Sequence, residues 1–173
     1  MIKKIDLNCI SVSVREMRRR DIRHVVDLDC SPLGIKHKEF SEKLRLDHVT
    51  NLIAEVDRVV IGFLSYATYR SNFDIHAVIV APELRRKKLG SKLLDIVHGQ
   101  MSSDGRYRSV CFVIEDNLPM HLFLKSHGYE AASRVIRNNA TGRDAYHFER
   151  FCDGFCSSDP SILGNKRELV VKE

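Results

Sequence analysis

Residues 78–94 read Val78-Ile-Val-Ala-Pro-Glu-Leu-Arg-Arg-Lys-Lys-Leu-Gly-Ser-Lys-Leu-Leu94, and this stretch predicts a strand, a basic loop and a helix in direct succession. Pro82 lacks the N–H that a β-ladder needs, so the strand must end there. The first N–H groups of the following helix have no partner within the helix. Together with the positive end of the helix dipole, these amides form a site for an anion such as a phosphate. Gly90 permits close backbone approach, Ser91 adds a hydroxyl group, and the cations of Arg85–Lys88 raise the local positive potential.

The part of the chain before this loop is rich in strand patterns. Runs of β-branched and aromatic residues, or of alternating apolar and polar residues, predict four strands. These strands are Ser11–Glu16, Thr50–Val56, Val59–Tyr69 and Phe73–Val80, with a tight hairpin at Asp57-Arg58. Two helices are predicted between the first and second strands, over Arg19–Asp29 and Lys38–Leu46.

The part after the loop alternates helices and strands. The predicted elements are a helix over Arg86–Met101, a strand over Arg108–Glu115, a helix from Asn117 to Gly128, and strands over Tyr129–Arg137 and Ala145–Phe151. The full order is β-α-α-β-β-β-α-β-α-β-β. Three consecutive strands before the longest helix predict the α/β class, with one mixed sheet and helices on both of its faces.

The chain has the size and composition of one folded domain. It contains 173 residues, of which 43% are hydrophobic and 29% are charged,. No apolar run reaches the roughly 18 residues of a membrane span, and no signal peptide is evident, so we expect a cytoplasmic protein without membrane contact. We expect an N-terminal extension over residues 1–10, the domain over 11–152, and a polar C-terminal tail over 153–173.

The charge of the chain is concentrated in two clusters. The net charge of +5 favours an acidic partner, such as nucleic acid, an anionic membrane or a phosphorylated cofactor,. The clusters are Arg18–Arg20 and Arg85–Lys88, and neither has the interleaved aromatic residues of a single-strand binder. A small anion therefore suits the second cluster better than nucleic acid does. The five cysteines form no disulfide framework or zinc spacing, so no metal is expected,.

The loop resembles the acetyl-CoA signature of the GNAT superfamily of acyltransferases, Arg/Gln-x-x-Gly-x-Gly/Ala, entered by a strand that ends in Val-x-Pro. The corresponding residues here are Arg85-Arg86-Lys87-Lys88-Leu89-Gly90, so Lys88 replaces the first glycine. The resemblance implies that acetyl-CoA is the co-substrate. The residues that it implies for binding are Val78, Ile79, Val80, Arg85, Arg86, Lys87, Lys88, Leu89, Gly90 and Ser91.

The resemblance extends over about Ser11 to Phe151, and the last two strands are similar to the final hairpin of ribosomal-protein N-terminal acetyltransferases. Similar proteins carry an asparagine at a helix start, here Asn117, which by resemblance helps to hold the pantetheine arm. Two groups expected from the family are absent. Leu124 stands where many members have a tyrosine that acts as the acid, and Phe112 stands where some N-terminal acetyltransferases have a glutamate.

Acetyl transfer to an amine needs a base that removes a proton from the ammonium group and a donor that polarises the thioester carbonyl. Strand alternation predicts that two faces of Phe73–Val80 are formed by Asp74, His76, Val78 and Val80 on one side and by Phe73, Ile75, Ala77 and Ile79 on the other. Asp74 and His76 also stand where other superfamily members carry their catalytic glutamate or histidines. We therefore take Asp74 and His76 as catalytic candidates, with a purely structural role as the alternative.

The sequence leaves three functions open. The first is an N-acetyltransferase that acts on a primary amine, which could be a protein N-terminus, a lysine or a small molecule. The second is a GNAT-fold module that binds an acyl-CoA without turnover, which Lys88, Phe112 and Leu124 motivate. The third and weakest is a basic protein associated with nucleic acid. A homodimer is also open, since the last hairpin and tail commonly meet a partner subunit in similar proteins.

Overall fold

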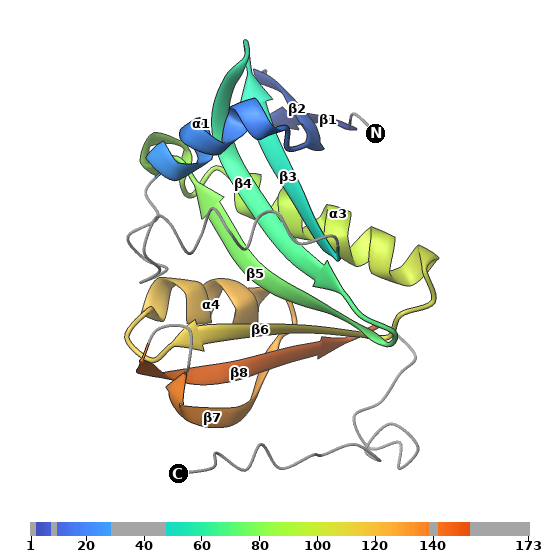
Figure 1. Cartoon of the computed structure of the whole chain (residues 1–173), viewed down its shortest axis with the longest axis vertical. Coiled ribbons are helices and arrows are strands. Elements are labelled where there is room, and N and C mark those ends of the chain that lie inside the picture. Colours follow the sequence, from blue (N-terminus) through green and yellow to red (C-terminus); the bar gives the residue numbers. More distant parts are fainter. Residues whose placement is uncertain (1–2, 8–9, 29–47, 139–141, 153–173) are drawn as a thin grey trace.

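The computed structural model describes residues 3–7, 10–28, 48–138 and 142–152 of the chain. In these residues eight strands form a single sheet in the order β1-β2-β3-β4-β5-β6-β8-β7 (Figure 1). The strands are β1 (Lys3–Leu7), β2 (Ile10–Glu16), β3 (Val49–Val56), β4 (Val59–Thr68), β5 (Asn72–Val80), β6 (Arg108–Ile114), β7 (Glu130–Asn138) and β8 (Arg143–Phe151). Neighbouring strands are antiparallel except for β5 and β6, which are parallel.

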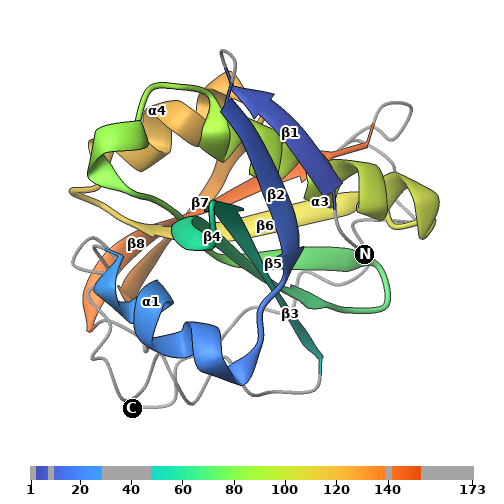
Figure 2. The ribbon, with the colours of Figure 1, turned by 90° about the horizontal axis from the view of Figure 1, so that it is seen from above.

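Helices cover both faces of this mixed sheet, as predicted. They are α1 (Ile22–Asp27), α3 (Leu89–Ser103) and α4 (Leu118–Ser126), with short 3-10 turns η1 (Arg19–Asp21) and η3 (Pro82–Leu84). Figure 2 shows α1 on one side of the sheet and α3 and α4 on the other. We call these two sides the α1 face and the α3 face.

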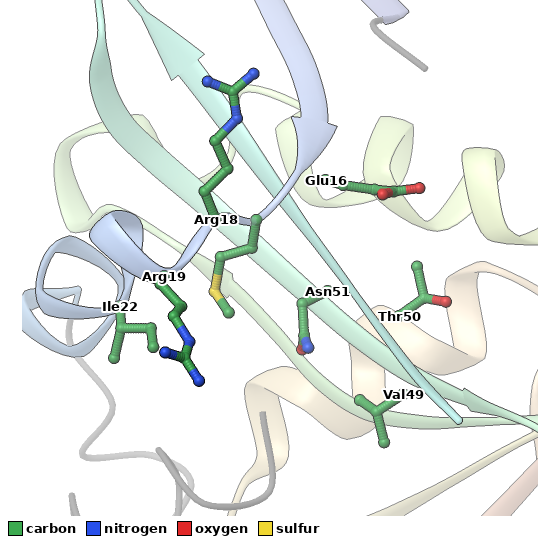
Figure 3. Close-up of a pocket in the computed structure, with 8 residues that line it drawn as sticks. Glu16, Arg18, Arg19, Ile22, Val49, Thr50 and Asn51 are labelled. Atoms are coloured by element: carbon green, nitrogen blue, oxygen red, sulfur yellow. The ribbon is translucent and has the colours of Figure 1, made fainter. Parts of the chain in front are cut away.

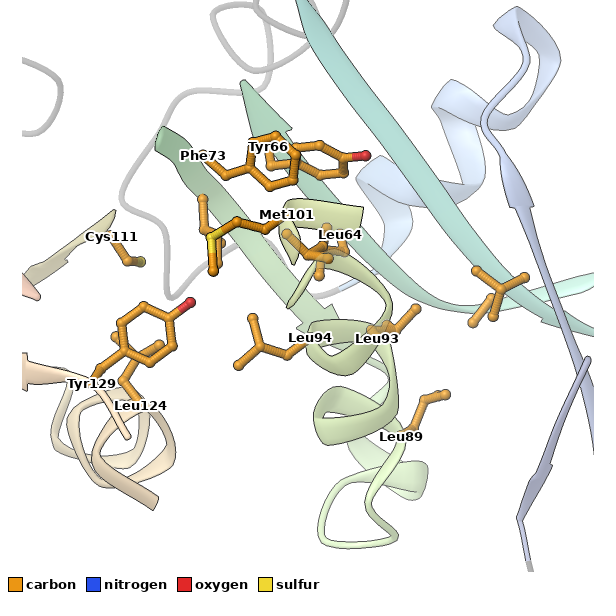
Figure 4. Close-up of a cluster of buried hydrophobic side chains, with 14 of the residues drawn as sticks. Leu64, Tyr66, Phe73, Leu89, Leu93, Leu94, Met101, Cys111, Leu124 and Tyr129 are labelled. Carbon is orange, nitrogen blue, oxygen red and sulfur yellow. The ribbon is translucent and has the colours of Figure 1, made fainter. Parts of the chain in front are cut away.

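Each face of the sheet has its own apolar cluster. On the α3 face, the buried side of α3 packs against the sheet and against Leu124 and Tyr129 (Figure 4). On the α1 face, Val25 and Leu28 pack over Phe63 and Ile79. Burial of such side chains stabilises the fold by about 1.5–3 kcal/mol each. The two clusters therefore hold helices on opposite sides of β4 and β5.

A buried ion network ties the start of α1 to the sheet. The guanidinium group of Arg15 on β2 donates to both carboxylate oxygens of Asp21, at 2.7 and 3.1 Å, and to both oxygens of Glu55 on β3, at 2.8 and 3.1 Å. These hydrogen bonds from Arg15 lower the pKa of Asp21,. The network fixes where α1 begins over the α1 face.

Every end of the seven predicted strands lies within two residues of its predicted position, and the predicted hairpin is present. Asp57 and Arg58 have φ values of 49° and 69°, which two-residue hairpin turns require,. Strand β1 was not predicted. The predicted helix Lys38–Leu46 and the tail 153–173 lie outside the described residues.

The start of the long helix differs from the prediction. It begins at Leu89, three residues after the predicted Arg86. Arg86 and Lys88 have φ values of 65° and 63°, which lie in the left-handed region and cannot continue a right-handed helix,. The basic residues therefore form a loop that leads into the helix.

Candidate active site

The sheet splits between its two parallel strands. Strands β5 and β6 pair only from Asn72 with Arg108 to Ile75 with Cys111. Beyond these pairs β5 continues to Val80 on its antiparallel partner β4, while β6 runs away from it toward α4 (Figure 1). The edge of β5 near Val80 is therefore directed to the split, where an extended ligand can add to the strand. The predicted cofactor residues Val78, Ile79 and Val80 lie on this segment.

The basic loop lies at the end of the same segment. Arg85 donates from Nε to the carbonyl oxygen of Val80 at 3.1 Å, which holds the loop against the strand. The first hydrogen bond of α3 joins the N–H of Lys92 to the carbonyl oxygen of Lys88, at 3.0 Å. The amides of residues 89–91 precede that bond, so they form the free first turn that suits an anion. The side chains of Arg85–Lys88 are exposed around it.

The structure explains the glycine of the family signature and its replacement here. Lys88 is the N-cap of α3 and adopts a left-handed conformation, with φ 63° and ψ 8°. Glycine adopts this conformation without strain, whereas other residues incur about 1–2 kcal/mol. Lysine therefore keeps the backbone path of the loop at a cost in stability, and its side chain is exposed.

Gly90 lies where α3, α4 and β5 approach one another. A Cβ atom built on Gly90 would lie 3.5 Å from the ring of Phe123 on α4 and 3.7 Å from Val80 on β5. Asn117 forms the N-cap of α4, where its Oδ1 accepts a hydrogen bond from the N–H of Met120 at 3.3 Å. This cap fixes the start of α4 on the far side of the split. A role of Asn117 toward pantetheine stays a prediction.

A β-bulge changes the predicted faces of β5. In the register with β4, Ser65 pairs with Ala77 and Tyr66 with Ile75, so His76 is an extra residue in β5,. The predicted alternation is therefore wrong beyond His76. Phe73 and Ile75 pack in the cluster on the α3 face together with Val78 and Val80, whereas Ala77 and Ile79 pack with α1. The bulge removes Val78 and Val80 from the face that Asp74 and His76 share.

Asp74 is a carboxylate held largely out of water. It pairs with Ala67 on one side and with Val110 on the other, and it lies on the α1 face. Burial raises the pKa of Asp74 to about 6, and the charge of Arg108 opposes that rise,. His76 is exposed at the bulge two residues further on. Asp74 and His76 therefore lie two residues apart on β5, and their catalytic role stays a prediction.

Leu124, which stands at the position of the family's tyrosine, and the nearby Tyr129 both lie in the interior. Leu124 is fully buried in the core beside Tyr129. The hydroxyl group of Tyr129 lies 2.6 Å from Oγ of Ser109 and 2.9 Å from Nε2 of His98, and burial raises its pKa. Tyr129 therefore has the packing role that its place after Gly128 favours.

Sequence reasoning missed a histidine on the α1 face. His147 on β8 pairs with Phe112 on β6, and the two rings stack with centroids 4.8 Å apart and an interplanar angle of 15°. Phe112 is 41% exposed. Burial lowers the pKa of His147. Only the pairing of β6 with β8 brings these rings together, and the spacing of the two residues in the chain does not reveal it.

A cavity of about 390 Å³ lies where β2 leads into α1. It is lined by Glu16, Met17, Arg18, Arg19, Ile22, Val49, Thr50 and Asn51. In Figure 3 the side chains of Arg19, Ile22 and Asn51 surround the same opening. The cavity thus includes two members of the first basic cluster, Arg18 and Arg19.

Two features are absent from the described residues. None of their helices is long and apolar enough to cross a bilayer. Nor do these residues contain a group of three or more His, Cys, Asp or Glu side chains placed to hold a metal ion.

A mixed sheet that splits at its parallel pair, with an amide-rich basic loop at the end of the split strand, defines the acyl-CoA N-acyltransferase fold. The sequence profile of the Acetyltransferase (GNAT) family matches residues 13–129. The chain belongs to this family. No curated protein matches it in sequence.

Solved structures of the same fold come from several acetyltransferases. Ard1 from Thermoplasma volcanium is similar with a TM-score of 0.71 and 21% identity, over 81% of this chain and 97% of its own. The ribosomal-protein-S18-alanine N-acetyltransferase from Escherichia coli has a TM-score of 0.69 and 14% identity, over 86% and 98%. PaiA N-acetyltransferase from Thermoplasma acidophilum, in complex with coenzyme A, has a TM-score of 0.65 and 18% identity, over 83% and 100%. At these identities the likeness shows the fold.

Proposed function

We propose that this protein is an N-acetyltransferase that transfers the acetyl group of acetyl-CoA to a primary amine by direct attack. The observation that carries the proposal is the basic loop 85–91, whose free helix amides lie at the end of the split strand β5. Membership of the GNAT acetyltransferase family supports acetyl-CoA as the co-substrate. The similar structures described as N-acetyltransferases support an amine as the acceptor.

In this proposal the loop and the strand bind different parts of acetyl-CoA. The amides of Leu89, Gly90 and Ser91 and the cations of Arg85–Lys88 hold the pyrophosphate. The pantetheine arm extends along the edge of β5 at Val78–Val80. This arrangement points the thioester toward the place where β5 and β6 separate.

The amine then attacks the thioester carbonyl carbon beside Asp74 and His76. The new N–C bond forms as the C–S bond breaks, and the electron pair of that bond leaves on sulfur. Asp74 and His76 take part in removing a proton from the ammonium group, which frees the lone pair that attacks. A thiol has a pKa of about 8.5, so the thiolate is a good leaving group near neutral pH, and Leu124 is compatible with turnover.

The experiment combines binding with turnover. Acetyl-CoA binding is measured by calorimetry, and CoA release is followed over a panel of N-terminal peptides, lysine peptides and small amines. Replacing Arg86 and Lys87 together by alanine should weaken acetyl-CoA binding by about tenfold or more, because two cations near the pyrophosphate are lost. The matched control Arg23→Ala, an exposed arginine on α1, should leave binding unchanged.

The second candidate function is a module that binds acyl-CoA without turnover. The burial of Leu124 and the apolar Phe112 at two expected catalytic positions favour it. Tight binding with no CoA release from any amine would support this alternative. Failure to bind acetyl-CoA at millimolar concentration would contradict both functions.

A further inference from the structure

The rings of Phe112 and His147 form a row across the sheet at the point where it splits. The last pair between β5 and β6 joins Ile75 to Cys111, so the next residues, His76 and Phe112, lie at the mouth of the split. On its other side Phe112 pairs with His147 of β8. Phe112 is therefore paired with and stacked on a histidine of β8, while His76 follows the last β5–β6 pair on the other side of the split.

The side chains of Phe112 and His147 both belong to the α1 face. Cys111 and Val113, which flank Phe112, are buried in the cluster on the α3 face, so Phe112 points to the opposite face,. His147 stacks on Phe112 and must share that face. A second row on the same face runs from Asp74 through Val110 to Glu149.

Proton balance requires that two protons leave the acceptor nitrogen in this reaction. An ammonium group loses one proton before its nitrogen can attack. The nitrogen loses a second proton after the N–C bond has formed, because the amide product carries only one hydrogen on nitrogen. The Asp74–His76 pair on β5 supplies an acceptor for one of these protons.

We propose that His147 accepts the other proton from the acceptor nitrogen, which lies over the exposed face of Phe112 at the mouth of the split. This inference rests on the proposed acetyl transfer and adds a further catalytic residue to it. The proton moves to a ring nitrogen of His147 directly or through one water molecule, as the electron pair of the C–S bond leaves on sulfur.

The surroundings of His147 suit this role. Burial lowers the pKa of His147, while the carboxylate of Glu149 on the same strand raises it and Arg108 on β6 lowers it. On β7 the residue paired with it is the uncharged Ser133, and Asp74 on β5 lies in the second row of the same face. The ring is therefore neutral near pH 7, and a neutral imidazole has one nitrogen that accepts a proton.

Other histidines of the fold have different environments. His98 is bonded to Tyr129 in the interior, and burial lowers its pKa to about 4. His121 bonds to the carbonyl oxygen of Ile114 and packs against Tyr146 and Phe148 on the α3 face. The register places His147 beside the split on the α1 face.

The test compares His147→Phe, which keeps a stacked ring but has no proton acceptor, with His147→Gln and with the control His24→Gln. His24 is an exposed histidine on α1. With acetyl-CoA and the amine that the wild type acetylates best, both His147 variants should lose about 100-fold or more in kcat, with KM for acetyl-CoA within about twofold. The acid limb of the kcat profile should become shallower, because one group fewer must be deprotonated. His24→Gln should behave as the wild type.

The outcomes separate the two proposals. If the wild type acetylates an amine and His147→Phe keeps its kcat and its pH profile, the role of His147 is overturned and the transferase stands. If the wild type binds acetyl-CoA but acetylates no amine, the transferase fails and the role of His147 fails with it. A separate readout is the NMR signal of the His147 ring, which should shift when a peptide acceptor joins the complex with CoA. No shift would also overturn the inference.

Discussion

Replacing Asp74 by asparagine should stabilise the fold and slow the reaction at the same time. Asp74 has a pKa of about 6 in the folded protein against 3.8 as the ordinary value, because it is largely buried. The folded state therefore binds more protons than the unfolded state between these two pKa values. It follows that the contribution of Asp74 to the free energy of unfolding falls as pH rises through this window, and the full penalty remains above about pH 6.

The size of the effect follows from the two pKa values. A rise from 3.8 to about 6 corresponds to about 3 kcal/mol of preference for the neutral carboxyl group, at about 1.4 kcal/mol per pH unit,. The penalty should be near this ceiling at about pH 7.5 and close to 1 kcal/mol at about pH 4.5. The asparagine amide must also find hydrogen-bond partners, so we expect Asp74→Asn to gain about 1–2 kcal/mol at the higher pH and much less at the lower.

Urea unfolding at the two pH values measures this difference, with Asp95→Asn as the matched control. Asp95 is an exposed carboxylate on α3, and its replacement should change stability by less than about 0.5 kcal/mol at either pH,. CoA release by Asp74→Asn is measured in parallel and should fall by about 100-fold if the carboxylate takes part in proton removal. An equal or lower stability of Asp74→Asn near pH 7.5, or a gain that does not depend on pH, would show that the carboxylate is not held out of water. A gain in stability with unchanged turnover would leave Asp74 as a structural residue.

Four further outcomes are expected. Lys88→Gly should raise the free energy of unfolding by about 0.5–1 kcal/mol, since it relieves the left-handed backbone, and a lower melting temperature would contradict this,. Leu124→Ala should cost about 2–5 kcal/mol in urea unfolding, because the side chain is fully buried, and a loss below about 1 kcal/mol would refute its place in the core,. Tyr129→Phe should cost about 1–3 kcal/mol by leaving Ser109 and His98 without their shared hydroxyl group, and an unchanged midpoint would oppose that hydrogen-bond pair,. The wild-type kcat should rise with pH through about 6 and then stay level to about pH 9, whereas an alkaline fall would reveal a general acid,.

Sequence periodicity predicted the strands and helices well because each one buries an apolar face of its own. The alternation in Ser11–Glu16, with Val12 and Val14 buried, and the apolar stripe of α3 are local patterns, and they survive in the fold. The start of α3 was misplaced because Arg86 and Lys88 adopt left-handed conformations that their residue types disfavour,. The surrounding loop determines the left-handed backbone conformation of Lys88, and the residue type alone does not predict that conformation.

The candidate site could be predicted only where it is continuous in the chain. The loop 85–91 carries its own signal, as a proline, a run of cations and a glycine ahead of an apolar stripe. The bulge at His76 depends on the register between β4 and β5, and the stack of Phe112 on His147 depends on the pairing of β6 with β8. Both arise from the pairing of one strand with another, so the sequence pattern of a single strand holds no record of them.

The distribution of ionisable groups indicates which part of acetyl transfer this chain assists. Tyr129 is a poor substitute for the missing acid, because its hydroxyl group is held in the interior and burial raises its pKa. Protonation of the leaving sulfur matters least, since a thiolate is stable near neutral pH. Removal of protons from the amine matters most, because an ammonium nitrogen has no free lone pair. Asp74, His76 and His147 share the α1 face beside the split, where an acceptor amine would meet the thioester. In the proposed reaction the chain therefore supplies proton acceptors for the amine, and the thiolate leaves without a general acid.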